Sequence, residues 1–336
     1  MDPIRRHGWK IPLSTPIRHL TVALLLASPA ALAGPAIWVA PALASPEGLT
    51  LAGRVLQDAP RPGSSPLSRN LRRLLAPNWE GASVEVEFQG VKASVTSGDD
   101  GAFSVDLRPG EGHRFESGPS VAEVRVAGAR ARARVEVVAD DVPFLVVSDF
   151  DDTVAVTGVT SARSLLTSAL LRDGHTQEAV PGMAAFYGCL RAGAAPAFAL
   201  VSGSPIQYLS RVRMFLARNG FPSGFGVYLR DLGPGTWSGY KQPIIRRLLR
   251  QFPQPVVLVG DSGEKDPEVY REIRDEFPGR VKAIYIRDAG HSEDPKRFAD
   301  MVLFQAPRTA AEHAAKAGLA SPGCVAASLP VAKEAP

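Results

Sequence analysis

The sequence predicts an α/β fold on an open sheet, preceded by an antiparallel β-sandwich. Three short apolar runs, at 144–147, 197–201 and 255–259, each lead directly into polar residues. Runs of this kind are typical of buried strands in α/β sheets. Between residues 49 and 138 the apolar residues instead alternate with polar ones, which is typical of half-buried strands. A chain of 336 residues is long enough for both parts.

The first 44 residues are predicted to be a signal peptide. Arg5 and Arg6 belong to a basic region, the apolar run 20–26 follows it, and small-residue sites stand at 31–33 and 42–44. This order is typical of a secretory leader, so we expect a secreted or periplasmic mature protein. An uncleaved membrane anchor is the alternative, although the prolines of the leader disfavour a spanning helix.

The excess of positive charge is concentrated in this leader. The formal net charge is +4 and the pI is about 9.2, but the leader alone carries four basic side chains against one acidic side chain. The remaining residues are close to neutral, so we expect no nucleic-acid partner. The hydrophobic content of 45% is sufficient for buried cores. No pattern in the sequence indicates a particular oligomeric state.

Residues 45–140 are predicted to form the β-sandwich, because turn-forming residues separate short alternating segments. The segment 96–103 resembles the hairpin of transthyretin-like and carboxypeptidase-regulatory-like modules, which implies a transthyretin-like domain. A basic stretch at 61–73 is interpreted as a solvated insertion, with attraction to an anionic lipid surface as the alternative. The expected strands are 49–56, 83–88, 91–96, 102–107, 121–126 and 131–138.

The strongest chemical signal follows the first apolar run. Asp149, Asp151, Asp152 and Thr153 stand directly after it, at the edge where open α/β sheets bind their ligands. Carboxylates this close raise one another's pKa unless a cation neutralises them. A divalent metal with oxygen ligands meets that need. One carboxylate can then act as a nucleophile and another as a general acid or base. A plain calcium loop or an acidic turn is the alternative.

Three further segments place polar side chains at corresponding positions. Ser202 ends the second apolar run and Asp261 ends the third, with Asp266 shortly after it. Lys241 stands at the start of a helix expected over 241–252, where the macrodipole disfavours a cation. A nearby anionic site explains a lysine at that position, and a solvated surface lysine is the alternative.

In this order the four segments resemble the haloacid dehalogenase-like superfamily of phosphoryl-transfer enzymes. The resemblance implies a Rossmann-like domain with a small cap, which we assign to 141–306. The motifs Ser148–Thr153, Val201–Pro205 and Gly260–Tyr270, with Tyr240 and Lys241, are similar more specifically to the catalytic domain of the fungal actin-patch phosphatidate phosphatases and their bacterial relatives. That family implies Mg²⁺-dependent hydrolysis of phosphatidate to diacylglycerol and phosphate.

The resemblance also implies a role for each motif residue. Asp149 is expected to attack phosphorus and form an aspartyl-phosphate, while Asp151 serves as general acid and then as general base. Asp151 is expected to offer its main-chain carbonyl to the metal, and Asp266 to orient Lys241 or a water at the metal. The predicted catalytic residues are Asp149, Asp151, Ser202 and Lys241, the substrate contacts are Thr153, Gly203 and Ser204, and the Mg²⁺ site comprises Asp149, Asp151, Asp261 and Asp266.

The stretch between the first two motifs is a candidate cap. Residues 161–172 show an apolar helical face, and we interpret part of this segment as a cap that admits acyl chains, with plain core packing as the alternative. Residues 173–176 would form its rim. His175 in that rim is interpreted as incidental, because Asp151 already supplies the acid and base.

Two features of the C-terminal half carry no catalytic assignment. Cys189 and Cys324 are the two cysteines of the chain. Because Cys189 lies in an apolar segment, we predict a buried thiol there and no disulfide to the tail. Residues 307–336 are rich in alanine and are predicted to be a C-terminal tail.

The sequence therefore favours an exported, Mg²⁺-dependent phosphatase of phosphatidate or another lipid phosphate, with peripheral membrane contact. The first alternative is a broad-specificity acid phosphatase or nucleotidase that acts on soluble phosphomonoesters with the same residues. The second is a non-enzymatic surface module, which the complete set of motif residues disfavours.

Overall fold

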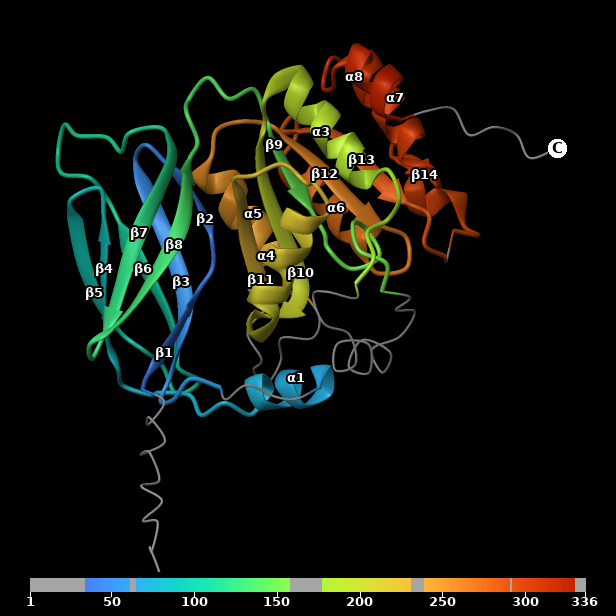
Figure 1. Cartoon of the computed structure of the whole chain (residues 1–336). Coiled ribbons are helices and arrows are strands. Elements are labelled where there is room, and N and C mark those ends of the chain that lie inside the picture. Colours follow the sequence, from blue (N-terminus) through green and yellow to red (C-terminus); the bar gives the residue numbers. More distant parts are fainter. Residues whose placement is uncertain (1–33, 61–64, 158–176, 231–238, 291, 330–336) are drawn as a thin grey trace, which may run out of the picture. The chain divides into compact units, whose positions relative to one another are not determined.

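A computed structural model describes residues 34–60, 65–157, 177–230, 239–290 and 292–329 of the chain (Figure 1). All of them belong to one compact unit, Ala33–Pro336. The predicted cap at 161–172, its rim at 173–176 and His175 lie outside the described residues. None of the helices in the described ranges combines the length and the apolar character that spanning a bilayer requires.

The N-terminal part of the unit contains an eight-stranded sheet in the order β1-β3-β2-β8-β7-β4-β5, with β6 paired to β3. The paired strands run antiparallel, except β2 and β8, which run parallel. The strands are β1 (Ala36–Val39), β2 (Ala42–Ser45), β3 (Gly48–Leu56), β4 (Ser83–Phe88), β5 (Val91–Thr96), β6 (Ala102–Leu107), β7 (Gly118–Val126) and β8 (Ala129–Val137).

Alternation of side chains explains why these segments are strands. In β4 and β6 every second residue is buried, because successive side chains of a strand point to opposite faces of the sheet. The buried set forms one apolar cluster that includes Leu51, Val86, Phe88 and Val124. All six strand segments predicted between residues 49 and 138 are strands in the structure. The basic stretch at 61–73 overlaps α1 (Pro66–Leu74).

Residues 34–45 belong to this fold. β1 pairs with β3, and all four residues of β2 are buried between β3 and β8. A leader that ended after Ala44 would therefore remove two strands of the sheet. A leader that ended at the small-residue site 31–33 would leave both strands in place.

The C-terminal part contains a six-stranded sheet in the order β11-β10-β9-β12-β13-β14, in which all neighbouring strands run parallel. The three predicted buried strands lie side by side at its centre. The strands are β9 (Leu145–Ser148), β10 (Ala197–Pro205), β11 (Phe225–Arg230), β12 (Val256–Asp261), β13 (Val281–Arg287) and β14 (Val302–Phe304).

Helices bury both faces of this parallel sheet. Val146 and Val259 belong to one apolar cluster, which also holds residues of α3, α4 and α7, whereas Leu145 and Leu258 belong to another with residues of α5 and α6. The helices are α3 (Met183–Ala194), α4 (Leu209–Arg218), α5 (Lys241–Gln251), α6 (Asp266–Glu276), α7 (Pro307–Lys316) and α8 (Pro322–Ser328), with the 3-10 turns η1 (Ile206–Tyr208) and η2 (Pro295–Phe298).

The alanine-rich segment after residue 306 is mostly helical and packed. Ala310, Ala314 and Val325 are buried in the same cluster as the residues of α3. Small side chains allow this close approach, because a Cβ on Gly193 would lie 2.5 Å from the backbone of Ala320. The segment therefore forms part of the core up to residue 329.

The prediction for the two cysteines was wrong. Cys189 of α3 and Cys324 of α8 form a disulfide, with a Cα–Cα distance of 5.3 Å. Cys189 is buried, as expected, but the helix that carries Cys324 packs against it. The physical reason for the error is that the C-terminal segment was treated as a tail, whereas its alanines form a buried helical face.

Candidate active site

The site lies at the carboxyl edge of the parallel sheet. β9 is the neighbour of both β10 and β12, so the residues that end these strands meet at one edge. Asp149 follows β9, Ser202 lies near the end of β10, and Asp261 ends β12. Lys241 is the first residue of α5. All four predicted motifs are therefore brought to the same edge, where open α/β sheets bind their ligands.

One lysine connects three of the acidic residues. The Nζ atom of Lys241 lies 2.9 Å from Asp149 Oδ1, 2.5 Å from Asp266 Oδ1 and 3.1 Å from Glu264 Oε2. Asp149 and Asp266 are each only 1% exposed. Buried charges are tolerated when they are paired and hydrogen-bonded, so Lys241 explains how these carboxylates remain inside the protein.

The ionisation of these groups is strongly perturbed. Burial raises the pKa of Asp149 well above its ordinary value, although the charge of Lys241 opposes this shift. The pKa of Asp266 is raised in the same way. Burial by itself would lower the pKa of Lys241, but the neighbouring carboxylates raise it well above its ordinary value. Lys241 therefore keeps its charge near neutral pH.

Asp261 offers an oxygen that has no hydrogen-bond partner among the residues that the structure describes. Its Oδ1 atom accepts hydrogen bonds from the backbone N–H groups of Gly263 and Glu264, at 2.7 and 3.2 Å. Its Oδ2 atom is buried and makes no hydrogen bond. Burial and the nearby Asp266 raise the pKa of Asp261 to about 8. A buried carboxylate oxygen without a partner is costly, which indicates that this group binds something further.

Asp149, Asp261 and Asp266 form a group suited to a cation. Their side chains are buried, and each can offer one carboxylate oxygen within 4.8 Å of the others. Oxygen-only donor sets are those that hard divalent cations prefer. Gly260 is required for this arrangement, because a Cβ there would lie 2.4 Å from Asp266 Oδ2 and 2.7 Å from the ring of Tyr270.

Asp151 is held by hydroxyl groups. Its Oδ2 atom accepts hydrogen bonds from Ser204 Oγ at 2.8 Å and from Ser202 Oγ at 3.2 Å. Burial raises the pKa of Asp151, and the bond from Ser204 opposes that shift. A carboxyl group with a raised pKa can hold a proton at neutral pH and release it, as a general acid and base must. The side chain of Asp151 is not in the metal-binding group.

The other predicted contacts lie next to these groups. Thr153 Oγ1 donates to Asp149 Oδ2 at 3.2 Å. Gly203 is exposed, and a Cβ on it would meet no atom within 4 Å, so there is open space beside the two serines. Asp152 has a structural role: it adopts a φ of 51°, and its Oδ1 atom accepts from the N–H of Thr157. Arg287 donates to the carbonyl of Asp152.

Several groups that support the site were not assigned from the sequence. Glu264 also pairs with Lys241. Its position in the acidic segment after β12 was the sequence pattern that could have identified it. Arg297 donates to the carbonyls of Ser262 and Glu264, and so holds the loop that follows Asp261. Ser148 Oγ donates to the carbonyl of Asp149 and contacts the hydroxyl of Tyr187 at 2.6 Å. The contacts of Arg297 and of Tyr187 join residues more than 30 positions apart, which explains why no local pattern predicted them.

The fold and the site together define a Rossmann-like α/β domain with a carboxylate and lysine site at its strand ends. Residues 144–288 match the family model described as the catalytic domain of phosphatidate phosphatase APP1. The resemblance expected from the motifs is thereby confirmed for this segment.

Similar proteins agree with this match over the same part of the chain. Phosphatidate phosphatase APP1 of Saccharomyces cerevisiae is 34% identical over 155 residues, which are 44% of this chain and 26% of that protein. An uncharacterized protein of Schizosaccharomyces pombe is 30% identical over 152 residues, 43% of this chain and 25% of that protein. The chain thus spans about a quarter of the length of these relatives.

A solved haloacid dehalogenase family hydrolase from Deinococcus radiodurans is also similar. It is 14% identical, the match covers 54% of this chain and all of that one, and the TM-score is 0.37. A TM-score this low carries no argument about the fold, so the similarity to the phosphatidate phosphatase catalytic domain rests on the sequence matches.

Proposed function

We propose that the protein hydrolyses a lipid phosphomonoester, with phosphatidate as the substrate class, to diacylglycerol and phosphate. The observation that carries this proposal is the buried group Asp149, Asp261 and Asp266 around one lysine, at the end of the strands that match the phosphatidate phosphatase family model. Asp149 is the nucleophile in this proposal, and an aspartyl-phosphate is the intermediate.

The donor set fits Mg²⁺. Three buried carboxylates supply hard oxygen ligands, and the buried Asp261 Oδ2 has no other partner. We propose that Asp149, Asp261 and the carbonyl of Asp151 hold the ion, while Asp266 orients Lys241. When bound, Mg²⁺ would offset negative charge on the phosphoryl group. The pairing of both Asp266 oxygens, one with Lys241 and one with the N–H of Asp261, supports this positioning role.

In the first step, an oxygen of Asp149 attacks phosphorus and the bond to the glycerol oxygen breaks. Asp151 donates its proton to that leaving oxygen, and its raised pKa supports this role. Lys241 and the hydroxyl of Ser202 stabilise the charge that gathers on the phosphoryl oxygens. The alcohol product is diacylglycerol.

In the second step, a water molecule attacks phosphorus. Asp151, now deprotonated, accepts a proton from that water. The bond between phosphorus and the Asp149 oxygen breaks, which releases phosphate and regenerates the carboxylate. Ser204 keeps Asp151 oriented in both steps through its 2.8 Å hydrogen bond.

Three finer expectations belong to this proposal. The N-terminal sheet is proposed to be a β-sandwich of transthyretin-like type, because its alternating strands enclose one apolar cluster. A small cap from the segment between the first two motifs is proposed to admit acyl chains. The protein is proposed to contact membranes peripherally, because the substrate is a lipid.

We further propose that the protein is exported and that its leader is cleaved at the 31–33 site. The disulfide between Cys189 and Cys324 supports export, because disulfides persist in oxidising compartments. The burial of β2 supports cleavage before residue 34. The mass of the mature N-terminus measures this directly. A mature chain that begins at Ser45 would contradict the proposal, because it would lack β1 and β2.

Phosphate release tests the catalytic proposal. The leaderless protein is incubated with phosphatidate in mixed micelles and with p-nitrophenyl phosphate, each with Mg²⁺ and with EDTA. We expect Mg²⁺-dependent release from phosphatidate that Asp149→Asn lowers by more than about 10³-fold, as the loss of a nucleophile does. Val86→Ala, which changes only the N-terminal sheet, is the control.

The two substrates distinguish the alternatives. Turnover of the soluble ester alone would favour the broad-specificity phosphatase. Turnover of neither substrate by a folded protein would contradict the proposal.

A further inference from the structure

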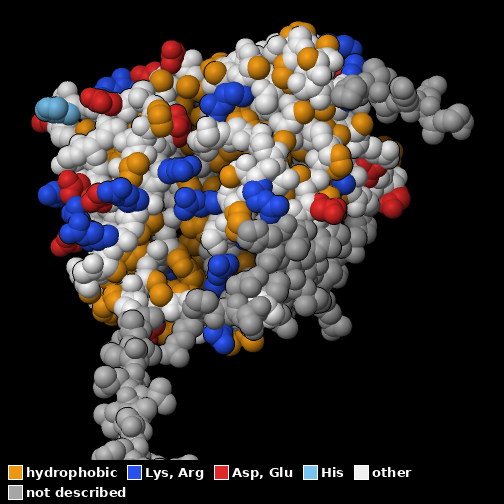
Figure 2. Space-filling model, in the orientation of Figure 1, with side chains coloured by type: hydrophobic (Ala, Val, Ile, Leu, Met, Phe, Trp, Pro, Cys, Tyr) orange, Lys and Arg blue, Asp and Glu red, His pale blue; other side chains and the backbone are white. Residues whose placement is uncertain are grey.

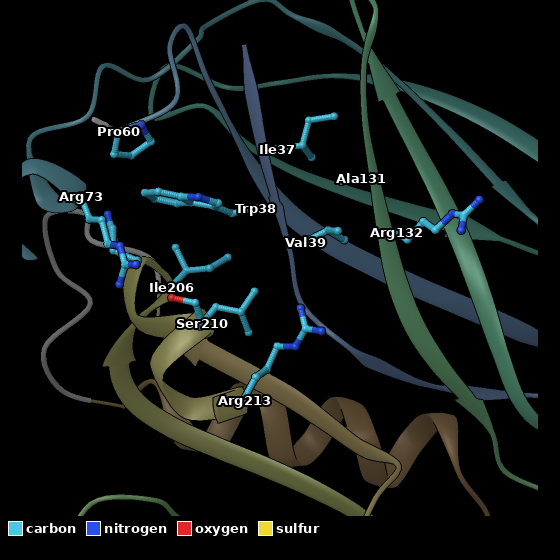
Figure 3. A pocket seen from close by; sticks show the side chains of 12 residues that line it. Ile37, Trp38, Val39, Pro60, Arg73, Ala131, Arg132, Ile206, Ser210 and Arg213 are labelled. Carbon is cyan, nitrogen blue, oxygen red and sulfur yellow. The ribbon is translucent and has the colours of Figure 1, made fainter. Parts of the chain in front are cut away.

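A cavity of the protein has none of the candidate active-site residues in its lining. It is a cavity of about 400 Å³ between β1, α1, β8 and the η1–α4 segment. Its apolar lining includes Ile37, Trp38, Ile206 and Leu209. In Figure 3 the indole of Trp38 lies at the centre, with Pro60 on one side of its plane and Ile206 on the other.

Among the described residues, the charged side chains that line this cavity are all positive. Three arginines and no acidic residue belong to its lining. Arg73 and Arg213 have no acidic partner among the residues that the structure describes, whereas Arg132 pairs with Glu123 at 3.4 Å. Figure 3 shows the guanidinium groups of Arg73 and Arg213 on the side of the indole where Ile206 lies, while Arg132 points away. Two unpaired cations beside an apolar floor favour a ligand that is both anionic and apolar.

Arginines and apolar side chains also mix on the surface around this region. Figure 2 shows Lys and Arg side chains spread across the middle of this face, with hydrophobic side chains between them. A surface of this kind is suited to the boundary between lipid head groups and acyl chains, because arginine can bind phosphate while its methylene groups and the indole contact apolar material.

The chain links this cavity to the candidate active site. Ser204 donates its hydroxyl to Asp151, and Ile206, two residues further on, lines the cavity. The Cα atoms of residues two positions apart in the chain lie at most about 7 Å from each other. The contact with Asp151 and part of the cavity wall thus belong to one short segment of the chain, whereas Asp149, Asp151 and Lys241 do not line the cavity.

We propose that this cavity is a non-catalytic binding site for the head group of an anionic phospholipid. The phosphate of that lipid contacts Arg73 and Arg213, and its glycerol and upper acyl carbons contact Trp38 and Ile206. A lipid bound in this cavity would hold the carboxyl edge of the parallel sheet at the lipid surface from which the substrate comes. This role of the cavity rests on the proposed lipid phosphatase function.

Vesicle binding by the leaderless protein tests this proposal without any turnover. The vesicles contain phosphatidylcholine alone or with phosphatidylglycerol, whose phosphate is a diester and so is not a substrate of a phosphomonoesterase. We expect binding to the anionic vesicles that Arg73→Glu with Arg213→Glu weakens by about tenfold or more, since each basic residue near an anionic surface contributes appreciably. Lys282→Glu with Lys316→Glu, two exposed lysines outside the cavity lining, changes the net charge by the same amount and is the control, which should leave binding unchanged.

Three further readouts separate the possible outcomes. Dibrominated phosphatidylglycerol should quench the fluorescence of the protein, and Trp38→Phe should remove most of that quenching. Turnover of p-nitrophenyl phosphate should be unchanged in the double arginine variant, which establishes that its catalytic domain is folded. Millimolar inorganic phosphate should compete only weakly, because it lacks the apolar part of the ligand.

Some results would overturn the proposal. Equal binding of the double variant and the parent protein to anionic vesicles would do so, and so would full displacement by inorganic phosphate, which would identify a phosphate site. If the binding result holds but phosphatidate is not hydrolysed, the cavity proposal survives and the proposed substrate fails. If phosphatidate is hydrolysed but binding does not depend on the two arginines, only the cavity proposal fails.

Discussion

The two sheets of this protein hold their charged residues in different ways. In the eight-stranded sheet, charged side chains lie mainly on the outer face, as in the pairs of Arg125 with Glu87 and Glu123, whose side chains are about one-third exposed. In the parallel sheet, every residue of β9 and β12 is buried, and the acids lie at the strand ends. Exposed pairs add little to stability, whereas buried acids are costly unless something binds them. From this difference we expect the proposed chemistry to depend on the carboxyl edge of the parallel sheet.

The strongest test of this contrast is Lys241→Met. The change leaves Asp149, Asp266 and Glu264 without their shared cation. Breaking a buried ion pair costs about 3–5 kcal/mol, and we expect phosphate release to fall by more than about 10³-fold. Chemical denaturation with EDTA and a phosphate assay measure both effects. Added Mg²⁺ should recover part of the stability, and a variant as stable as the parent in EDTA would argue against the pairing.

A matched pair of leucines sharpens the comparison. Leu51 in β3 and Leu258 in β12 are both fully buried. Replacing either by alanine should lower the free energy of unfolding by about 2–5 kcal/mol. Leu258→Ala should also lower the turnover number, because Leu258 lies three residues before Asp261, whereas Leu51→Ala should not. Unfolding curves and turnover numbers for the folded fraction check this. Equal losses of turnover in both variants would show that the two sheets are not functionally separate.

The pH dependence of stability tests the buried acids separately from the packing of the sheets. Burial raises the pKa of Asp261 from 3.8 to about 8 in the folded, metal-free protein. Between these values the folded state holds a proton that the unfolded chain has released, so stability falls as the pH rises. The decrease ends above about pH 8, where both states have lost the proton.

Asp261→Asn removes this titration. In EDTA, we expect its stability to fall less steeply than that of the parent between pH 4 and 8, as measured by urea denaturation at several pH values. Asp149, Asp151 and Asp266 also have raised pKa values, so the slope should become smaller and not vanish. An unchanged slope would contradict the assignment of Asp261 as a buried, protonated group.

Local patterns predicted most of the strands and the motif residues. The alternation in β4 and β6 and the apolar run of β12 have a period that a short window of sequence reveals. The acids and Lys241 were predictable because each follows a strand or begins a helix. What failed depended on contacts between distant residues. Cys324 reaches Cys189 across a separation of 135 residues, and no local pattern reveals a pairing over that distance.

The place of β2 has a consequence for the order in which the chain folds during synthesis. One edge of β2 pairs with β3, which is the next strand in the chain. The other edge pairs with β8, which is synthesised much later. Leu43 also donates its N–H to the hydroxyl of Tyr228, which is 185 residues further on. At a synthesis rate of about 5–20 residues per second, that partner emerges on the order of ten seconds or more after Leu43. Until β8 emerges, β2 has an open apolar edge of the kind that promotes mispairing. The earliest strands of the fold are therefore among the last to acquire all their neighbours.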